Sequence, residues 1–471
     1  MPAKRSLPIS RRRFLGQASC ASVGAVSLFS TLFNMRMSSA LAQSAPVVSP
    51  FGDYKAMVCL FLAGGADSYN MLVPYGDSEY NEYQGIRADL ALSRDTLLPL
   101  ELQGGDGRQF GVHPGMPEVQ SMFNNGNLAF INNVGTLVEP VTLETWEAGS
   151  ARVPEGLFSH SDQIQQWQTS IPDQRSTEGW FGRMADIMHT ANSNDRISMN
   201  LSLSGNNVMQ SGSNVVSFSI DPYNGAAGIN DYGEDTWWGN IRTPAINSML
   251  DMTYQNAFEQ AFATKVRTSI DASVEFSSAY NAASPLTTAF SDNEISQSFR
   301  TVAQSISIAG SLGMTRQTYF ILFGGWDHHD EVINNQAQML PVVSQALGEF
   351  NTALGEIGMQ NAVTTFTASD FARTLTSNGR GSDHAWGGSQ MVMGGAVNGS
   401  RFYGNFPELY EGNSLDTGRG RLIPTISTDE FFAELALWFG VPNSEITNIF
   451  PNLDRFYDPN NPNLPLGFLT T

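Results

Sequence analysis

Two stretches far apart in the chain share one pattern: a continuous apolar run, a pair of glycines and then an aspartate. The first stretch is 55–67 and ends in Asp67, and the second is 319–327 and ends in Asp327. Apolar runs without polar alternation are typical of strands buried on both faces, as in parallel sheets. Only a parallel sheet would bring both aspartates to the same carboxyl edge, where open α/β folds bind their ligands. The pattern therefore predicts an α/β fold with a mostly parallel sheet.

The second stretch continues into residues that commonly bind metals. Asp327, His328, His329 and Asp330 follow one another in a chain that has only six histidines. Neutral imidazole nitrogen together with carboxylate oxygen suits Zn²⁺, Mn²⁺ or Fe, whereas Ca²⁺ prefers oxygen alone. The alternative is a polar loop with solvated histidines, and this stretch does not by itself distinguish the two.

A third apolar run leads to another acid nearer the C-terminus. The run 362–368 is followed by Asp370 and Arg373, and His384 stands in the glycine-rich loop 379–388. Arg373 could bind an anionic substrate or form a salt bridge with Asp370. The same edge of the sheet is therefore expected to receive an acid and a histidine from this region.

A serine and a histidine lie at a predicted helix start. Ser159 and His160 precede the helical run 163–168, and the unpaired amides of a helix N-terminus favour an anion. A serine beside a histidine fits a nucleophile that faces an oxyanion. A plain N-cap serine, at Ser159 or Ser161, is the alternative.

The N-terminus predicts export. Residues 10–15 read Ser-Arg-Arg-Arg-Phe-Leu, which fits the twin-arginine export pattern, and a weakly apolar run with a small-residue site at 40–42 follows. We therefore expect a signal peptide over 1–42, recognition by the twin-arginine export machinery, and a periplasmic or secreted protein. The run is too short and too weakly apolar for a stable membrane anchor. The residues before Cys20 make a poor lipid-attachment site.

Charge and cysteine content limit which partners the chain can bind and which disulfides it can form. The chain has 25 basic and 45 acidic residues, and removal of 1–42 removes six basic residues and no acid, so the formal net charge goes from −20 to −26. Such a surface repels nucleic acid and anionic membranes. Cys59 alone remains after maturation, within an apolar strand, so an intrachain disulfide is excluded and stability must come from the core.

The mature chain, 43–471, is expected to form a single domain with an insertion around 198–313. Within the insertion, alternating stretches predict half-buried strands, and long helices are predicted over 243–280 and 292–310. These residues show no recognisable chemistry. We therefore expect the insertion to cover the core or to shape substrate access.

Together these motifs resemble an exported family, domain of unknown function 1501, over nearly all of the mature chain. The resemblance rests on Gly64-Gly65-Ala66-Asp67 with Asn70 and Pro74, His113-Pro114, Ser159-His160, Gly179-Trp180-Phe181-Gly182-Arg183, Asp327 with His329, Ser369 to Thr374, and Gly381 to His384. That family is similar to the alkaline phosphatase and sulfatase superfamily. The implied fold is a three-layer α/β/α sandwich with metals at the carboxyl edge of a mostly parallel sheet. The resemblance implies Ser159 as nucleophile and, as metal ligands, Asp67, Asp327, His329, Asp370 and His384.

The chain departs from the superfamily pattern at two places. Phe371 follows Asp370 where the superfamily usually has histidine, and the related family more often has glutamate at position 370. No Cys/Ser-x-Pro-x-Arg sequence lies near 159, so formylglycine chemistry is not expected.

Two functions are compatible with these observations. The first is a metal-dependent hydrolase of phosphate or sulfate esters, which acts on an anionic ester substrate. In that hydrolase a divalent metal, Zn or Mn, would polarise the ester and Ser159 would attack, while a second metal or Arg373 would stabilise the developing charge. His160 would be a ligand or a proton carrier. The second function is a non-catalytic exported protein that retains the fold for binding or surface assembly.

Overall fold

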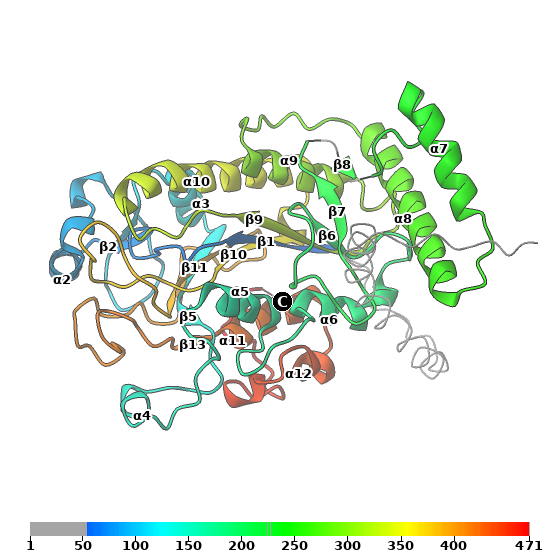
Figure 1. The fold of residues 1–471 in the computed structure, drawn as a ribbon. Coiled ribbons are helices and arrows are strands. Elements are labelled where there is room, and N and C mark those ends of the chain that lie inside the picture. Colours follow the sequence, from blue (N-terminus) through cyan, green and yellow to red (C-terminus); the bar gives the residue numbers. More distant parts are fainter. Residues whose placement is uncertain (1–53, 224, 227, 471) are drawn as a thin grey trace, which may run out of the picture.

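The computed structural model describes residues 54–470 except 224 and 227. The signal peptide predicted over 1–42 lies outside these residues. Within them, a ten-stranded sheet runs through the centre of the molecule (Figure 1). Its order is β12 (Phe402–Tyr403), β5 (Leu128–Gly135), β11 (Gly388–Met393), β10 (Val363–Ser369), β1 (Lys55–Leu62), β9 (Arg316–Phe323), β6 (Asn200–Ser202), β7 (Phe218–Asp221) and β8 (Gly225–Ala226), with β13 (Ile426–Ser427) beside β5.

The sheet is mostly parallel, as predicted. Within the described part of this large sheet, the antiparallel pairs are those that β11 forms with β10 and β5 and that β8 forms with β7. A separate small sheet contains β2 (Leu72–Pro74), β4 (Phe110–Val112) and β3 (Leu98–Pro99).

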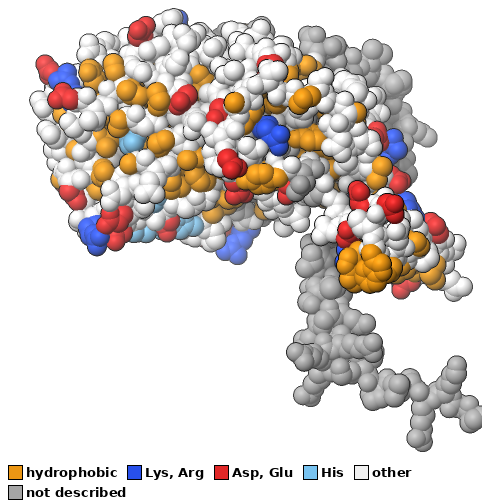
Figure 2. Space-filling view, turned by 90° about the horizontal axis from the view of Figure 1, so that it is seen from above, with side chains coloured by type: hydrophobic (Ala, Val, Ile, Leu, Met, Phe, Trp, Pro, Cys, Tyr) orange, Lys and Arg blue, Asp and Glu red, His pale blue; other side chains and the backbone are white. Residues whose placement is uncertain are grey.

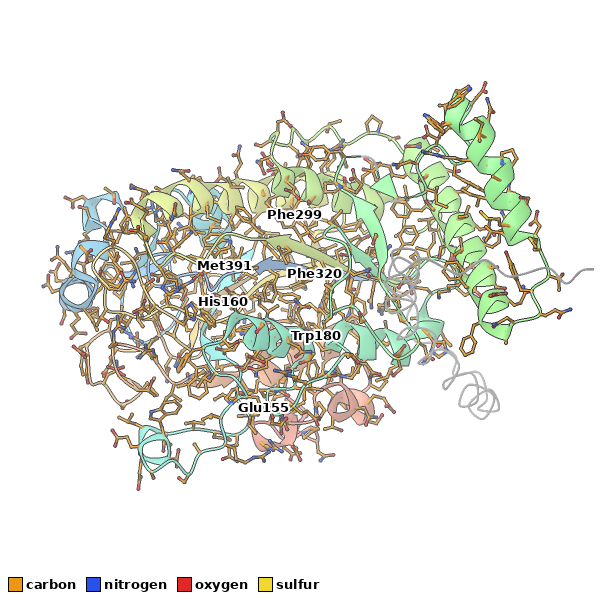
Figure 3. The ribbon with its side chains drawn as sticks, in the orientation of Figure 1. Glu155, His160, Trp180, Phe299, Phe320 and Met391 are labelled. Carbon is orange, nitrogen blue, oxygen red and sulfur yellow. The ribbon has the colours of Figure 1, made fainter. Side chains whose placement is uncertain are left out.

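Helices cover both faces of the large sheet (Figure 1). One layer contains α3 (Pro117–Asn124), α9 (Glu294–Ser307) and α10 (Val332–Glu356), and the other contains α5 (His160–Thr169), α6 (Trp180–Ile187), α11 (Thr428–Phe439) and α12 (Ile446–Ile449). Figure 3 shows Phe299 in the first layer and Trp180 in the second, with Phe320 of β9 between them. The three-layer α/β/α sandwich is therefore confirmed.

The two layers explain the unbroken apolar run of β1. Its alternate residues enter two different cores: Ala56, Val58, Leu60 and Leu62 pack on one side, and Met57, Cys59 and Phe61 on the other. Because both faces of the strand are covered by helices, no position along it favours a polar residue.

Two predictions of local structure are wrong. The stretch 75–108 has tyrosines and acids but little hydrophobic periodicity, which predicts a loop. It contains α2 (Asp77–Arg87) and two short 3-10 helices, η1 (Ala88–Leu90) and η2 (Arg94–Thr96). The helix expected over 243–280 is two helices, α7 (Trp237–Leu250) and α8 (Ala257–Ala282). The break occurs because Asn256 caps α8 by accepting a hydrogen bond from the amide of Phe258.

The remaining short helices are α4 (Leu143–Glu147), η3 (His189–Ala191), η4 (Gln360–Ala362), η5 (Asn443–Glu445) and η6 (Leu453–Arg455). None of the described helices is both long and apolar enough to cross a membrane.

Within the region expected as an insertion around 198–313, β6, β7 and β8 belong to the large sheet and α9 belongs to a helix layer. Two further parts of this region lie outside these layers. The loop after β6 contacts α5, where Gln168 Oε1 accepts hydrogen bonds from the amides of Val208 at 2.9 Å and Met209 at 3.1 Å. The α7–α8 hairpin projects from the far end of the sheet, apart from His160 (Figures 1 and 3). Only the first of these parts is therefore positioned to shape access to α5.

Candidate metal centre

Three central strands end level with one another. In the sheet register Leu62 at the end of β1 lies opposite Ser369 of β10 on one side and Phe323 of β9 on the other. The loops that follow these strands are therefore neighbours at the carboxyl edge. The antiparallel β11 begins at this edge, so the loop that contains His384 arrives there too.

Glycine allows two of these loops to touch. Gly64 has φ +120°, and a Cβ atom on it would lie 2.5 Å from the amide nitrogen of Asp327. Its own amide donates to both carboxylate oxygens of Asp370, at 3.1 and 3.2 Å. Gly64 thus permits a close backbone approach that a larger residue would block.

Three histidines surround Asp327. The Nε2 atoms of His329, His160 and His384 lie 3.1, 3.5 and 3.6 Å from Asp327 Oδ1. The side chain of Asp327 is 48% exposed, and all three rings are partly exposed. The cluster is thus open to solvent while its members come from three separate segments of the chain.

Each ring is held from behind by an oxygen atom. His160 Nδ1 lies 2.7 Å from Asp370 Oδ2, and His384 Nδ1 lies 2.7 Å from the carbonyl oxygen of Phe158. His329 Nδ1 lies 3.1 Å from Asp383 Oδ1. A carbonyl or a carboxylate can only accept, so these contacts place the hydrogen on Nδ1 and leave a lone pair on Nε2. Metal-binding histidines are held in the same way.

The Nε2 atoms that face Asp327 lack suitable hydrogen-bond donors. His329 Nε2 and His384 Nε2 are 2.8 Å apart, although the Nδ1 contacts of both rings leave each Nε2 with a lone pair. His160 Nε2 is buried and has no hydrogen-bond partner within the described part of the chain. A shared cation removes both problems, because it accepts several lone pairs at once.

The donor set fits a divalent transition metal. His160, Asp327 and His384 each offer one ligand atom, and these atoms lie within 4.8 Å of one another. His329 adjoins this group through its contacts to Asp327 and His384. Imidazole nitrogens with one carboxylate oxygen are typical ligands of zinc.

The electrostatics keep the cluster in its ligand form. Burial lowers the pKa of His384, and the charge of Arg373 and the neighbouring imidazoles lower it further, so the ring stays neutral. Burial opposes ionisation of Asp327, but the hydrogen bond and charge of Arg373, with His160 and His329, hold the pKa of the carboxyl below its usual range. A neutral imidazole and an ionised carboxylate are the forms that bind metals.

Two acids behind the rings differ in their environment. Burial raises the pKa of Asp370, although His160 and the amide of Gly64 oppose this. Burial also disfavours ionisation of Asp383, but hydrogen bonds from Asn378, Arg419 and His329 lower the pKa of Asp383 to about 2. Asp370 was expected as a ligand; its carboxylate instead supports His160 from behind.

Arg373 ties the loops together, and its side chain is fully buried. Its Nη2 donates to Asp327 Oδ1 at 2.6 Å, to the carbonyl oxygen of Trp326 at 3.3 Å and to that of Gly64. Its Nε and Nη1 donate to the carbonyl oxygens of Gly65 and Ser382, at 2.7 and 3.2 Å. The predicted salt bridge with Asp370 is therefore corrected to one with Asp327, and substrate binding by this guanidinium is not supported.

Asp67 lies outside the cluster. Its Oδ2 forms an ion pair with Arg87 Nη2 at 2.6 Å, and neither side chain is exposed. Its Oδ1 accepts from the amide of Tyr69 at 3.1 Å. Asp67 was expected as a metal ligand; in the structure it lies apart from the histidines because α2, missed in the sequence, brings the buried cation of Arg87 to its carboxylate.

Ser159 precedes α5 but does not cap it. Its Oγ makes no capping hydrogen bond and lies 3.2 Å from Ser161 Oγ. No hydrogen bond among the described residues joins Ser159 Oγ to the three histidines. The sequence analysis did not identify Asp383 as the acceptor behind His329, although its position directly before His384 was a signal. No sequence signal pointed to the carbonyl oxygen of Phe158 as the acceptor behind His384.

Residues 54–416 match the family described as Protein of unknown function (DUF1501). The chain belongs to this family. The resemblance to domain of unknown function 1501 is thus confirmed.

No curated protein sequence matches this DUF1501 chain. Among solved structures, it is similar to Ps i-CgsB in complex with k-i-k-neocarrahexaose, with 9% identity and a TM-score of 0.32 over 86% of this chain and 77% of that chain. A sulfatase from Pseudoalteromonas sp. gives 10% identity and a TM-score of 0.32 over 89% and 72%. The lipoteichoic acid synthase LtaP from Listeria monocytogenes gives 8% identity and a TM-score of 0.30, over 81% of this chain and 78% of that chain. TM-scores of this size support no statement about activity.

Phe371 forms an apolar wall of the cluster in this DUF1501 protein. Its ring centroid lies 4.7 Å from that of His160 and 4.5 Å from that of His384. The superfamily that the sequence resembles usually has a histidine here. The phenyl ring supplies no ligand atom, so the arrangement favours a centre for one metal ion over a centre for two.

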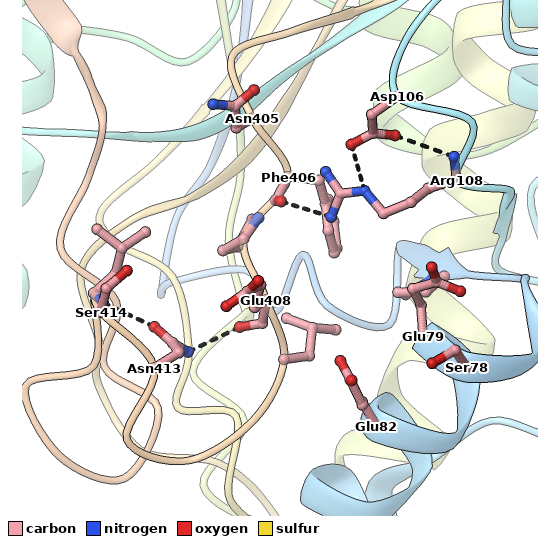
Figure 4. A pocket seen from close by; sticks show the side chains of 14 residues that line it. Ser78, Glu79, Glu82, Asp106, Arg108, Asn405, Phe406, Glu408, Asn413 and Ser414 are labelled. Atoms are coloured by element: carbon pink, nitrogen blue, oxygen red, sulfur yellow. Dashed lines mark hydrogen bonds and ion pairs between the residues drawn. The ribbon is translucent and has the colours of Figure 1, made fainter.

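A cavity of the DUF1501 protein that is lined by other residues has different chemistry (Figure 4). Its volume is about 530 Å³, and Glu79, Glu82 and Glu408 are among its lining residues. Arg108, also in the lining, is already paired with Asp106 at 2.7 Å and donates to the carbonyl oxygen of Phe406 at 2.9 Å. Because an acidic lining repels anions, we do not place an anionic ester here.

Proposed function

We propose that this protein is a metal-dependent hydrolase of phosphate or sulfate esters. The single observation that supports this most is the approach of three imidazole Nε2 atoms to Asp327 Oδ1, with each ring held from behind by an oxygen atom. Zn or Mn fits this donor set, with His160, Asp327 and His384 as ligands. His329 lies beside these ligands, and one coordination position would stay open to the ester. A bound divalent cation would supply Lewis acidity and positive charge for an anionic ester.

Ser159 is the nucleophile in this proposal. It directly precedes His160, and its hydroxyl makes no capping hydrogen bond, which leaves the oxygen available for attack. The free amides of the first turn of α5 favour the negative charge that an ester phosphate or sulfate brings. Arg373 acts through Asp327 as a positioning residue, since its guanidinium is fully buried and donates to the carboxylate of Asp327.

Metal content and turnover test the proposal together. The folded protein is expected to hold about one equivalent of Zn or Mn by elemental analysis, because the three ligand atoms of His160, Asp327 and His384 converge on one position. Asp327→Ala and His384→Ala should lose the metal and the hydrolysis of aryl phosphate or aryl sulfate, whereas the exposed His189→Ala should keep both. Protein that binds no metal and turns over neither ester would overturn the proposal.

The nucleophile is tested separately. Ser159→Ala should reduce turnover by at least about a hundredfold while metal content is unchanged. Ser161→Ala is the matched control, because its hydroxyl lies 3.2 Å from that of Ser159 on the same turn. If Ser159→Ala retains turnover, attack comes from water, and the hydrolase proposal stands without this nucleophile.

Phe371 is the observation that favours a non-catalytic alternative. It replaces a possible ligand with an apolar ring, so the cluster could bind a single metal without the charge needed for ester cleavage. A metal-loaded protein that binds phosphate or sulfate but cleaves neither class of ester would support a binding or surface-assembly role.

We also propose export by the twin-arginine machinery. The support is the Ser-Arg-Arg-Arg-Phe-Leu sequence at 10–15. Arg11→Lys with Arg12→Lys should retain the protein in the cytoplasm, and cell fractionation measures this. Unchanged export of that variant would contradict the proposal.

A further inference from the structure

The α7–α8 hairpin exposes large apolar side chains. The hairpin projects from the body (Figure 1), and hydrophobic side chains gather on it in the space-filling view (Figure 2). Six of these side chains are about half exposed or more. They are Trp237 68%, Trp238 51%, Ile241 49%, Met249 53%, Met252 55% and Phe262 59%. These six residues are called the hairpin surface below. Monomeric proteins rarely leave so many large apolar groups together in water.

In the α7–α8 hairpin, polar side chains lie between the two helices and apolar side chains face outward. Between its helices, Arg267 forms hydrogen bonds to Asn247 and Asp251, both at 2.8 Å, and Tyr232 donates to Asn247 at 2.7 Å. Of the α7 residues only Gly239 is buried. An amphipathic helix on a folded protein normally turns its apolar stripe inward and its polar side outward. The polar contacts here hold the two helices together, and the apolar side of α7 remains for another surface.

The apolar residues of α7 form one row along the helix. Trp238, Ile241, Ala245 and Met249 are spaced by three, four and four residues, and all four are exposed. Residues at this spacing lie on the same face of a helix. Such a row fits the side of a second helix, as in helix bundles.

The amount of apolar surface suits an interface between two copies. The exposed parts of Trp237, Trp238 and Phe262 alone amount to roughly 350 Å², since an aromatic side chain has about 150–250 Å² to bury. Ile241, Met249 and Met252 extend this toward the non-polar half of a standard interface of about 800 Å² per partner. One hairpin therefore supplies the apolar core that a stable dimer needs.

Charge favours a second copy over a lipid surface. Residues 237–282 contain four acidic and three basic residues, while the whole chain has a formal net charge of −20. Helices that bind membrane surfaces are rich in Lys and Arg, and anionic lipids repel an acidic protein. A nearly neutral hairpin on an acidic protein is a place where two copies can meet with little repulsion.

We propose that two copies of this chain associate through their hairpin surfaces about a two-fold axis, with the α7 row of one copy packed on the α7 row of the other. The interface is then self-complementary, because the same residues lie on both sides. It also lies apart from His160, so both metal centres remain open in the dimer (Figures 1 and 3).

Sedimentation of the full mature chain tests the proposal. The wild type should be a dimer at micromolar concentration, and Ile241→Glu with Met249→Glu should weaken association at least about a hundredfold, as loss of central interface residues does. Val153→Glu is the matched control, because Val153 is 38% exposed and lies outside the hairpin; it should dimerise like the wild type. A monomeric wild type, or a doubly substituted protein that still dimerises, would overturn the proposal.

Cross-linking tests the same contact without weakening it. Ala245→Cys lies in the middle of the row and should form an intermolecular disulfide under mild oxidation, because Cys59 is buried and does not compete. The exposed Ser204→Cys, outside the hairpin, should not. Absence of the Ala245→Cys cross-link would count against the two-fold contact. A monomeric wild type that sediments with phosphatidylglycerol and phosphatidylethanolamine vesicles would name a lipid surface as the occupant instead.

Discussion

The guanidinium of Arg373 is fully buried and donates to the half-exposed carboxylate of Asp327 across 2.6 Å. The pair joins the loop after β10 to the loop after β9, at the centre of the histidine cluster. A buried cation thus holds the carboxylate around which three imidazoles gather.

Replacement of this guanidinium should lower the stability of the protein. Arg373→Lys keeps the charge but cannot reach the four carbonyl oxygens and the carboxylate that Arg373 contacts, so we expect a loss of about 2–4 kcal/mol of unfolding free energy. Urea denaturation measures it. Arg380→Lys, at an exposed ion pair with Asp330 and Glu331, should leave the unfolding free energy nearly unchanged, because water screens such pairs. Equal stability of the two variants would indicate that Arg373 is not structural.

The acids behind the rings should tune metal affinity. Asp370→Asn and Asp383→Asn each remove the charged acceptor behind one imidazole, and we expect metal affinity to fall by about 10–100-fold. Competition with a chelator measures this. Asp330→Asn is the control, since Asp330 is exposed and pairs with Arg380 instead of an imidazole. Unchanged affinity in both of the first two variants would contradict the proposed arrangement of the rings.

Asp67 should matter for stability and not for metal content. Asp67→Asn leaves Arg87 as a buried, unpaired cation, which costs about 3–5 kcal/mol of unfolding free energy. Addition of Arg87→Gln should restore part of that loss, so a double-mutant cycle measures the coupling. The folded Asp67→Asn protein should keep its metal. Loss of the metal from this variant would indicate that Asp67 is a ligand.

Stability should fall as the pH rises toward 8 because of Asp429. This side chain lies in the first turn of α11, and burial raises the pKa of its carboxyl to about 8, although Ser170 and Arg183 oppose this. An unfolded aspartate loses its proton near pH 4. Between about pH 4 and pH 8 the folded state therefore holds a proton that the unfolded state has released, and each pH unit removes stability.

Asp429→Asn tests this dependence. It removes the titrating group, so its unfolding free energy relative to wild type should be higher at pH 8 than at pH 5, by urea denaturation. The exposed Asp454→Asn should show the same difference from wild type at both pH values. A parallel pH profile of wild type and Asp429→Asn would contradict a buried neutral carboxyl.

Much of the fold follows from local patterns in the sequence. The apolar runs of β1, β9 and β10 are visible because both faces of these strands are buried, so no polar residue interrupts them. The glycines and acids directly after the runs predict a shared edge, since parallel strands end at the same side of the sheet. Asp327, His329 and His384 are brought together there, as expected.

Only the tertiary structure decided which partner each side chain meets. Asp67 and Asp370 follow neighbouring strands in similar contexts, yet one faces Arg87 of α2 and the other faces His160 of α5. Arg373 could have reached either of two acids and pairs with Asp327. Strand endings are set by residues close in sequence, whereas these contacts join residues between 20 and 210 positions apart. They depend on where α2 and α5 pack, which no local pattern encodes.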